Sequence, residues 1–159
     1  MSFASKVNDA ISQVGQLSGP KAIRVQMAGQ SLSCQLDALD QLALAFSDLQ
    51  LWDDRLENAS MDRLSEVSKK LSAALTYLLE PISPIEIDTD RCVVQMRSNP
   101  PSSDDDRRSY YELLVQRDGS LNLNRYTKPN GGLRKLVPSH LTREVFARLV
   151  GDFAAAAGD

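Results

Sequence analysis

The sequence has little of what metalloproteins and disulfide-rich proteins carry. Its 159 residues include one histidine and two cysteines, and Cys34 and Cys92 stand apart from any CxxC or Cys/His cluster. Structural zinc sites need three or four such ligands at short spacing, so no zinc site is predicted. A disulfide framework needs more cysteines as well. We therefore expect both thiols to be reduced, in a reducing compartment.

Motifs for phosphate binding and for nucleophilic catalysis are also missing. No GxGxxG or GxxxxGK[ST] pattern occurs, which argues against an ATPase or a dinucleotide-dependent enzyme. Nothing near His140 resembles a GxSxG nucleophile elbow, and we expect this histidine at the exposed start of a helix. No cofactor, no metal and no catalytic residue is predicted, and an enzyme is the least favoured class of function.

Long apolar runs and an excess of positive charge are absent too. No stretch approaches the roughly 18 apolar residues of a membrane-spanning helix, and the first residues lack the apolar core of a secretory signal. The net charge of −3 argues against attraction of the whole chain to nucleic acid or to anionic membranes. We expect a cytoplasmic protein that does not bind membranes and for which nucleic acid is an unfavoured partner.

What the chain does contain is an ordinary globular composition, with 42% hydrophobic and 25% charged residues. Its length fits a single domain over residues 1–159. Apolar residues at spacings of three and four predict helices over residues 3–17, 60–80 and 139–157. Pro81 ends the second of these, and Ser60 suits its N-cap.

Alternating apolar residues predict strands between the helices. Residues 22–27 and 31–36 surround Gly29 and form a predicted hairpin, and Asp118-Gly119 is the strongest hairpin signal in the chain. The other predicted strands, read with the same alternation or as extended segments, are residues 82–88, 92–96, 110–116, 121–123 and 133–137.

Residues 36–52 fit two interpretations. As a helix, the stretch places Leu39, Leu42 and Phe46 on one face, and it contains no β-branched residue. As a strand, it places Leu42, Leu44 and Phe46 together, followed by Leu49 and Leu51 after a one-residue slip that a bulge would supply. The strand accounts for more of the apolar residues and is the interpretation we prefer.

These elements predict an α+β fold. We expect a twisted, mainly antiparallel sheet of five to six strands with three helices, in the order α-βββ-α-βββ-α. The repeated unit suggests an internal duplication of residues 21–80 and 85–157. A weak similarity between Glu66–Leu71 and Glu144–Leu149 is compatible with it.

Two acidic stretches are candidate cation sites. Glu86, Asp88 and Asp90 share one face of an extended segment, where carboxylates also discourage edge-to-edge aggregation. Asp104–Asp106 lie between two prolines and a strand and are followed by two arginines, which indicates a loop. The solvated-surface interpretation is preferred for both.

Two surfaces are candidates for binding. Residues 117–148 hold seven basic side chains against two acidic ones, which suggests an anion-binding or nucleic-acid-binding site at Arg125, Lys128, Arg134 and Lys135. The second surface is apolar: Trp52, Tyr110 and Leu114 fall out of step with the core faces of their segments and would form a partner-binding patch on an uncovered sheet.

In size, acidity and element order, the chain is similar to the small acidic chaperones of bacterial secretion systems, which are helix–sheet–helix–sheet–helix dimers. The resemblance rests on no specific residues. It implies a non-catalytic protein-interaction module whose partner is another protein, a second copy, or both. The alternative is an anion or nucleic-acid binder that uses the basic segment.

Overall fold

The structure is a computed structural model that describes residues 2–158. Residues 2–158 form three helices and one mainly antiparallel sheet. In chain order the elements are α1 (Phe3–Val14), β1 (Lys21–Met27), β2 (Gln30–Leu39), β3 (Ala43–Asp53), the 3-10 turn η1 (Asp54–Leu56), α2 (Met61–Ala74), β4 (Ile82–Asp88), β5 (Val93–Ser98), β6 (Ser102–Ser103), β7 (Arg107–Gln116), β8 (Ser120–Pro129), β9 (Lys135–Val137), β10 (Ser139–Thr142) and α3 (Arg143–Gly158).

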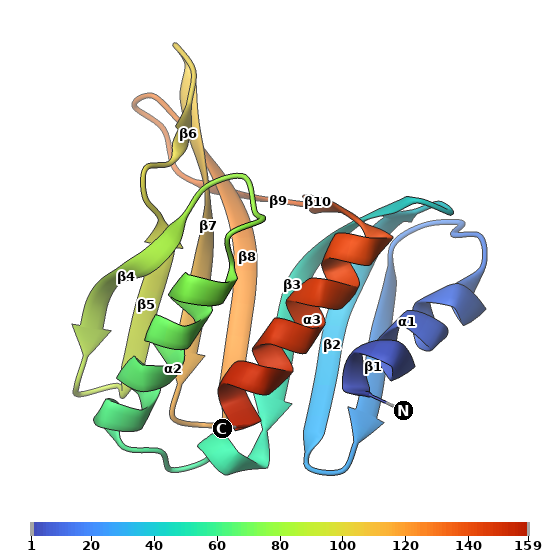
Figure 1. Ribbon diagram of the computed structural model, residues 1–159. Helices are drawn as coiled ribbons and strands as arrows, with labels where there is room; N and C mark the ends of the chain where they lie inside the picture. The colour runs from blue at the N-terminus through green and yellow to red at the C-terminus, as the bar shows by residue number, and fades with distance from the viewer. Residues whose placement is uncertain (1, 159) are drawn as a thin grey trace.

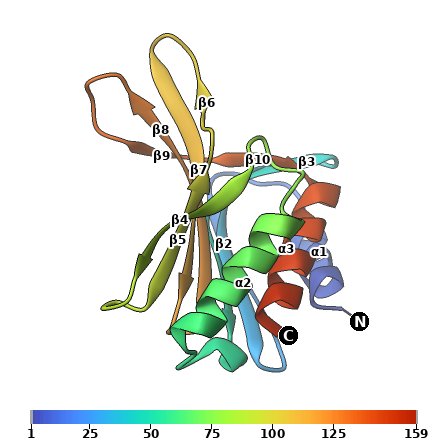
Figure 2. The ribbon, with the colours of Figure 1, turned by 60° about the vertical axis from the view of Figure 1, so that its left-hand side comes forward.

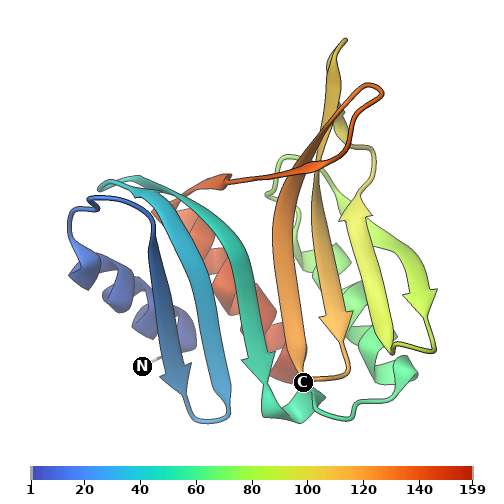
Figure 3. The same ribbon diagram turned by 180° about the vertical axis from the view of Figure 1, so that it is seen from behind.

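Within residues 2–158, the helices all lie on one face of the sheet, and the other face carries none (Figures 1 and 3). The strand order is β1-β2-β3-β8-β7-β5-β4, with β10 paired to β3, β6 to β7 and β9 to β8. The α+β class is confirmed, but five to six strands was too few, because the described residues form ten. Strand β9 lies within the predicted segment 133–137, whereas β6 and β10 were not predicted, because two and four residues are too few to show an alternating pattern.

The apolar side chains from one face of the strands and from one side of each helix pack together in a single core between the sheet and the helices. From α1, the fully buried stripe consists of Phe3, Val7 and Ile11. Phe46 of β3 meets Phe146 of α3 edge to face, with ring centroids 5.0 Å apart. The aromatic pair therefore joins the centre of the sheet to the helix that crosses it.

Residues 43–53 form strand β3, as the preferred interpretation predicts. The slip lies at Asp48, which has a φ of 50° and adds one residue to β3 opposite β2. The Asp48 amide donates to the Asn124 side chain at 2.8 Å instead of to the ladder. The bulge also divides one edge of β3: β10 pairs with it before Asp48 and β8 pairs with it after.

Three predicted helix boundaries were wrong. Helix α1 ends at Val14, where Gly15 takes a φ of 70°. Helix α2 ends at Ala74 rather than near residue 80, although Leu78 stays buried in the connection to β4. Helix α3 begins at Arg143, because Ser139–Thr142 pairs with β3 as β10, so His140 lies in a strand and not at a helix start.

The topology has two similar halves. The meanders β1-β2-β3 and β5-β7-β8 meet antiparallel at β3 and β8. Each half is followed by a helix that packs mainly on the other half: α2 contacts β4, β5 and β7, whereas α3 contacts β3. An internal duplication remains a prediction that this arrangement suits. No helix within residues 2–158 is both long enough and apolar enough to cross a bilayer.

Candidate functional site

The uncovered sheet face contains a groove over β4, β5 and β7 with a volume of about 1200 Å³. We call it the sheet groove. Strand alternation explains its floor, because residues between the buried core positions of β5 and β7 point away from the helices. The floor residues are Val93, Gln95, Arg97, Tyr110, Glu112 and Leu114, and the walls are β4 and the connection from β8 to β9.

Glu112 is the centre of the floor. Its side chain is 8% exposed, and its Oε2 accepts from Gln95 Nε2 at 2.9 Å, Arg97 Nη2 at 3.1 Å and Arg134 Nη1 at 2.8 Å. Burial acts to raise the pKa of Glu112, but the hydrogen bonds from Arg134, Arg97 and Gln95 and the charge of Arg134 outweigh it and hold the pKa below its usual range. Glu112 is therefore an anion that orients two cations, and these are charge-assisted contacts.

Both arginines also stack on tyrosines. The Arg97 guanidinium lies 4.7 Å from the centre of the Tyr110 ring, and that of Arg134 lies 3.9 Å from the Tyr126 ring. The two rings are cross-strand neighbours with centroids 6.0 Å apart. The stacks hold the planar groups in place before any ligand arrives. The Tyr110 ring is buried, while the Arg97 and Arg134 side chains are 35% and 42% exposed.

Arg134 reaches the floor because its loop folds back over the sheet. Gly131 has a φ of 72° after Pro129, which turns the chain from β8 into β9. The adjacent Leu133 is 87% exposed at the groove wall. On the opposite wall, Ile85 of the edge strand β4 is 46% exposed. Apolar side chains thus lie on both sides of a polar and aromatic floor.

Positive charge collects at the end of the groove nearest the β6–β7 turn. Arg108 and Lys128 are directly opposite each other on β7 and β8, are exposed, and both line the groove. Figure 2 shows this end of the two strands rising beyond the helices. Within residues 2–158 neither side chain forms an ion pair.

The sequence-predicted anion site is only partly assembled. Lys128 and Arg134 line the sheet groove, but Arg125 is buried on the helix side of β8, and exposed Lys135 lies outside the groove. Arg125 shares its strand face with Leu121 and Leu123, so alternation already places it on the core side. The number of basic residues in the segment does not show which of them alternate onto the core face of the strand.

The predicted partner-binding residues lie on the uncovered face but not together. Tyr110 and Leu114 belong to the groove floor. Trp52 lies on β3, where its Nε1 donates to the Asp118 carbonyl at 3.1 Å. Sequence reasoning missed Arg97 and Glu112; the signal for Glu112 was a carboxylate inside the apolar run "YYELLV".

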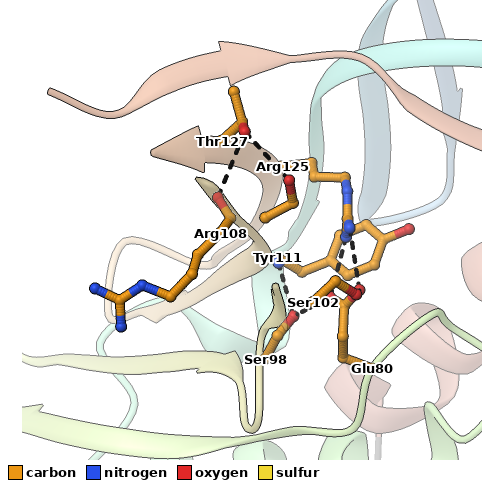
Figure 4. A network of polar contacts seen from close by, with 8 residues as sticks. Glu80, Ser98, Ser102, Arg108, Tyr111, Arg125 and Thr127 are labelled. Atoms are coloured by element: carbon orange, nitrogen blue, oxygen red, sulfur yellow. Dashed lines mark hydrogen bonds and ion pairs between the residues drawn. The ribbon is translucent and has the colours of Figure 1, made fainter. Parts of the chain in front are cut away.

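A buried polar network supports the groove from the helix side of the same strands (Figure 4). Glu80, in the connection from α2 to β4, accepts from Arg125 at 3.1 and 3.0 Å, from Ser98 Oγ at 2.7 Å and from Ser102 Oγ at 2.6 Å. The Ser98 hydroxyl in turn accepts from the Tyr111 amide at 2.7 Å. Arg125 stacks 4.5 Å from the Tyr111 ring centre. The network joins four strands behind the floor.

The acidic stretches bind the chain's own backbone. Asp104 Oδ1 accepts from the amides of Asp106 and Arg107, and Asp88 Oδ1 accepts from those of Asp90 and Arg91. Both are turns closed by an aspartate. Across residues 2–158, no three histidine, cysteine, aspartate or glutamate side chains are grouped to hold a metal ion.

No family model, no curated protein and no solved structure matches this chain. The similarity to secretion chaperones therefore stays a prediction from size, charge and element order. The sheet groove is the candidate binding site.

Proposed function

We propose that this chain is a non-catalytic protein-interaction module that holds an extended segment of a partner protein in the sheet groove. The observation that carries the proposal is the uncovered sheet face, with its prearranged arginine and tyrosine floor between two exposed apolar side chains. Interface cores are enriched in tyrosine and arginine, and residues already fixed in place lose little entropy on binding.

The shape of the groove favours a chain over a small molecule. Small-molecule pockets are enclosed and measure about 300–1000 Å³, whereas this groove exceeds that range and runs open along the strands. Among the strands of residues 2–158, β4 lies at the end of the sheet and pairs only with β5. A free strand edge can accept backbone hydrogen bonds from an extended peptide, while pockets beside it select side chains.

Binding of an anion is the second candidate, and one observation favours it. Arg108 and Lys128 are like charges opposite each other, an arrangement that destabilises a sheet unless a counter-ion is near. A nucleic acid fits less well than a protein, because Glu86, Asp88 and Glu112 line the same groove and would repel a phosphate backbone. A cytoplasmic location and self-association remain part of the proposal.

Site-specific photo-crosslinking tests the proposed function. A benzophenone amino acid at Leu133 should cross-link a protein in cells, whereas the same group at Leu42 should not. Leu42 is a matched control because it is 79% exposed but lies at the turn between β2 and β3, away from the groove. A product of twice the chain mass would identify a second copy as the partner. Equal yields at both positions, or none at Leu133, would contradict the proposal.

A further inference from the structure

We infer that the sheet groove takes an extended peptide segment with carboxylates at one end, held by Arg108 and Lys128, and without carboxylates at the other end, beside Glu86. The inference rests on the proposed function and specifies the chemistry and the orientation of the partner. Three observations carry it: the excess of positive charge in the groove, the separation of that charge from the acidic end, and the apolar walls between them.

The charge of the groove is positive in the middle and at the end near the β6–β7 turn, and it is negative beside Glu86. Its lining has five basic and three acidic side chains. In the middle, Glu112 is bonded to Arg97 and Arg134, and at the lower end Asp88 pairs with Arg91 at 3.9 Å. Glu112 neutralises only one of its two arginines, so the middle keeps one positive charge. The other unpaired charges of the lining are Arg108 and Lys128 at the end near the β6–β7 turn and Glu86 at the opposite, lower end. A ligand that complements these charges carries negative charge at the end held by Arg108 and Lys128 and neutral or positive charge at the end beside Glu86.

The register of the strands gives the length of the segment. Glu86 pairs with Gln95, Gln95 pairs with Leu114, and Leu114 lies six residues along β7 from Arg108. At about 3.3 Å per residue, the two charged ends are roughly 20 Å apart. An extended segment of about six or seven residues spans that distance.

The occupant is a peptide on two grounds. Exposed Ile85 and Leu133 line the groove and can pack against apolar side chains, which a sugar–phosphate backbone lacks. Repulsion from Glu86 at the lower end also opposes a polyanion that is charged along its whole length. A peptide can change the sign of its charge within seven residues, whereas a nucleic acid cannot.

The guanidinium of Arg108 is free to meet a carboxylate. Its backbone carbonyl accepts from the Thr127 hydroxyl at 3.4 Å, while the side chain points away from the buried network (Figure 4). In the acidic turn between β6 and β7, Asp104 pairs with Arg107 at 3.7 Å, and none of Asp104–Asp106 lines the groove. The cation pair is therefore available to a ligand in the folded protein.

Fluorescence anisotropy with defined peptides tests the inference. The probes are fluorescein-labelled DDVTVTVK, its reverse KVTVTVDD, and the uncharged NNVTVTVQ, each titrated with the full chain at low salt. Both acidic peptides are needed because the charges fix the polarity of the ligand but not its chain direction. We expect one acidic peptide to bind at least about fivefold more tightly than NNVTVTVQ, since each exposed ion pair contributes modestly.

Matched variants locate the acidic end. Lys128→Glu should weaken the acidic peptide about tenfold, whereas Lys21→Glu, which makes the same charge change on exposed β1 at the opposite edge of the sheet, should change it less than about twofold. Glu86→Lys should weaken the peptide that ends in lysine. Lys128→Ala covers the case in which the reversed charge alters folding, and it should weaken binding in the same direction.

The outcomes separate the inference from the proposed function. If all three peptides bind equally and Leu133→Glu weakens all of them, the groove binds peptides and the charge polarity is wrong. If no peptide binds, or if single-stranded dT8 binds more tightly than any peptide with a steep dependence on salt, the inference is overturned. The cross-linking at Leu133 then judges the proposed function independently.

Discussion

Replacing Glu80 by glutamine tests the buried ion pair behind the sheet groove. The side chains of Glu80 and Arg125 are 4% and 10% exposed, and two N–H groups of the guanidinium donate to the carboxylate. Glutamine keeps the shape but turns one acceptor oxygen into a donor, so Arg125 remains charged and buried without a counter-ion. Breaking such a pair costs about 3–5 kcal/mol, and we expect Glu80→Gln to lower the free energy of unfolding by that amount.

A double-mutant cycle separates the ion pair from the loss of packing. Arg125→Met leaves the Glu80 carboxylate buried with only its two serine donors, and it should also be strongly destabilising. The combined variant contains no uncompensated charge. Its loss of stability should therefore be smaller than the sum of the two single losses by about 1–3 kcal/mol.

Urea unfolding at pH 7, followed by circular dichroism, measures the four free energies. The control is Asp88→Asn, because its pair with Arg91 is long, at 3.9 Å, and its two side chains are 38% and 85% exposed. That change should cost less than about 1 kcal/mol. A loss for Glu80→Gln no larger than that of the control, or strictly additive losses in the cycle, would refute the reasoning.

Acid adds a second readout for the same residue. Burial acts to raise the pKa of Glu80, but the hydrogen bonds from Arg125, Ser102 and Ser98 and the charge of Arg125 outweigh it, so its pKa lies below the usual range. A lowered folded-state pKa contributes stability above the unfolded pKa of about 4.3, and this stability is lost as the pH falls toward the folded value. Stability of the native chain should therefore fall below about pH 4, and it should fall less steeply in Glu80→Gln.

Three further predictions concern the core, a turn and the thiols. Phe146→Ala should lower the free energy of unfolding by about 3–5 kcal/mol, because the ring is 1% exposed against Phe46, and the melting temperature of Leu42→Ala serves as an unchanged reference. Gly119→Ala should lower the free energy of unfolding by about 1–3 kcal/mol in a urea titration, because φ is +103° and a Cβ would lie 2.8 Å from Trp52 Nε1. The control is Gly19→Ala, at an unstrained and open position, which should lower the free energy of unfolding by less than half as much. Burial, with the nearby Asp37 charge, raises the pKa of the Cys34 thiol to about 12, so Ellman's reagent at pH 8 should modify Cys92 first and Cys34 only after unfolding; equal rates for both thiols would contradict that expectation.

The sequence predicted the elements whose signals are local. The stripe of Phe3, Val7 and Ile11 predicts α1, and Gly29 and Gly119 mark hairpins that the structure confirms. Even the slip in β3 follows from the change of parity between Phe46 and Leu49. Each signal arises from residues within a few positions, where side-chain direction repeats with the period of the element.

The errors have a different origin. β10 forms because Ser139–Thr142 pairs with residues 43–46 of β3, which precede the Asp48 bulge and lie nearly a hundred residues earlier in the chain. The basic segment predicts one anion site, but β8 places Arg125 toward the helices, where Glu80 neutralises it, and Lys128 away from them. The net charge of a segment does not show on which face of the strand each charged side chain lies.

By itself, the sequence determined the α+β class, the three helices and the faces on which Tyr110 and Tyr111 lie. Only the tertiary structure decided that all three helices cover one face, which turns Tyr110, Glu112 and Leu114 into a groove floor and Tyr111 into core. The reason is physical: alternation along a strand assigns a side chain to a face, but whether that face is covered depends on helices that pack there from distant parts of the chain.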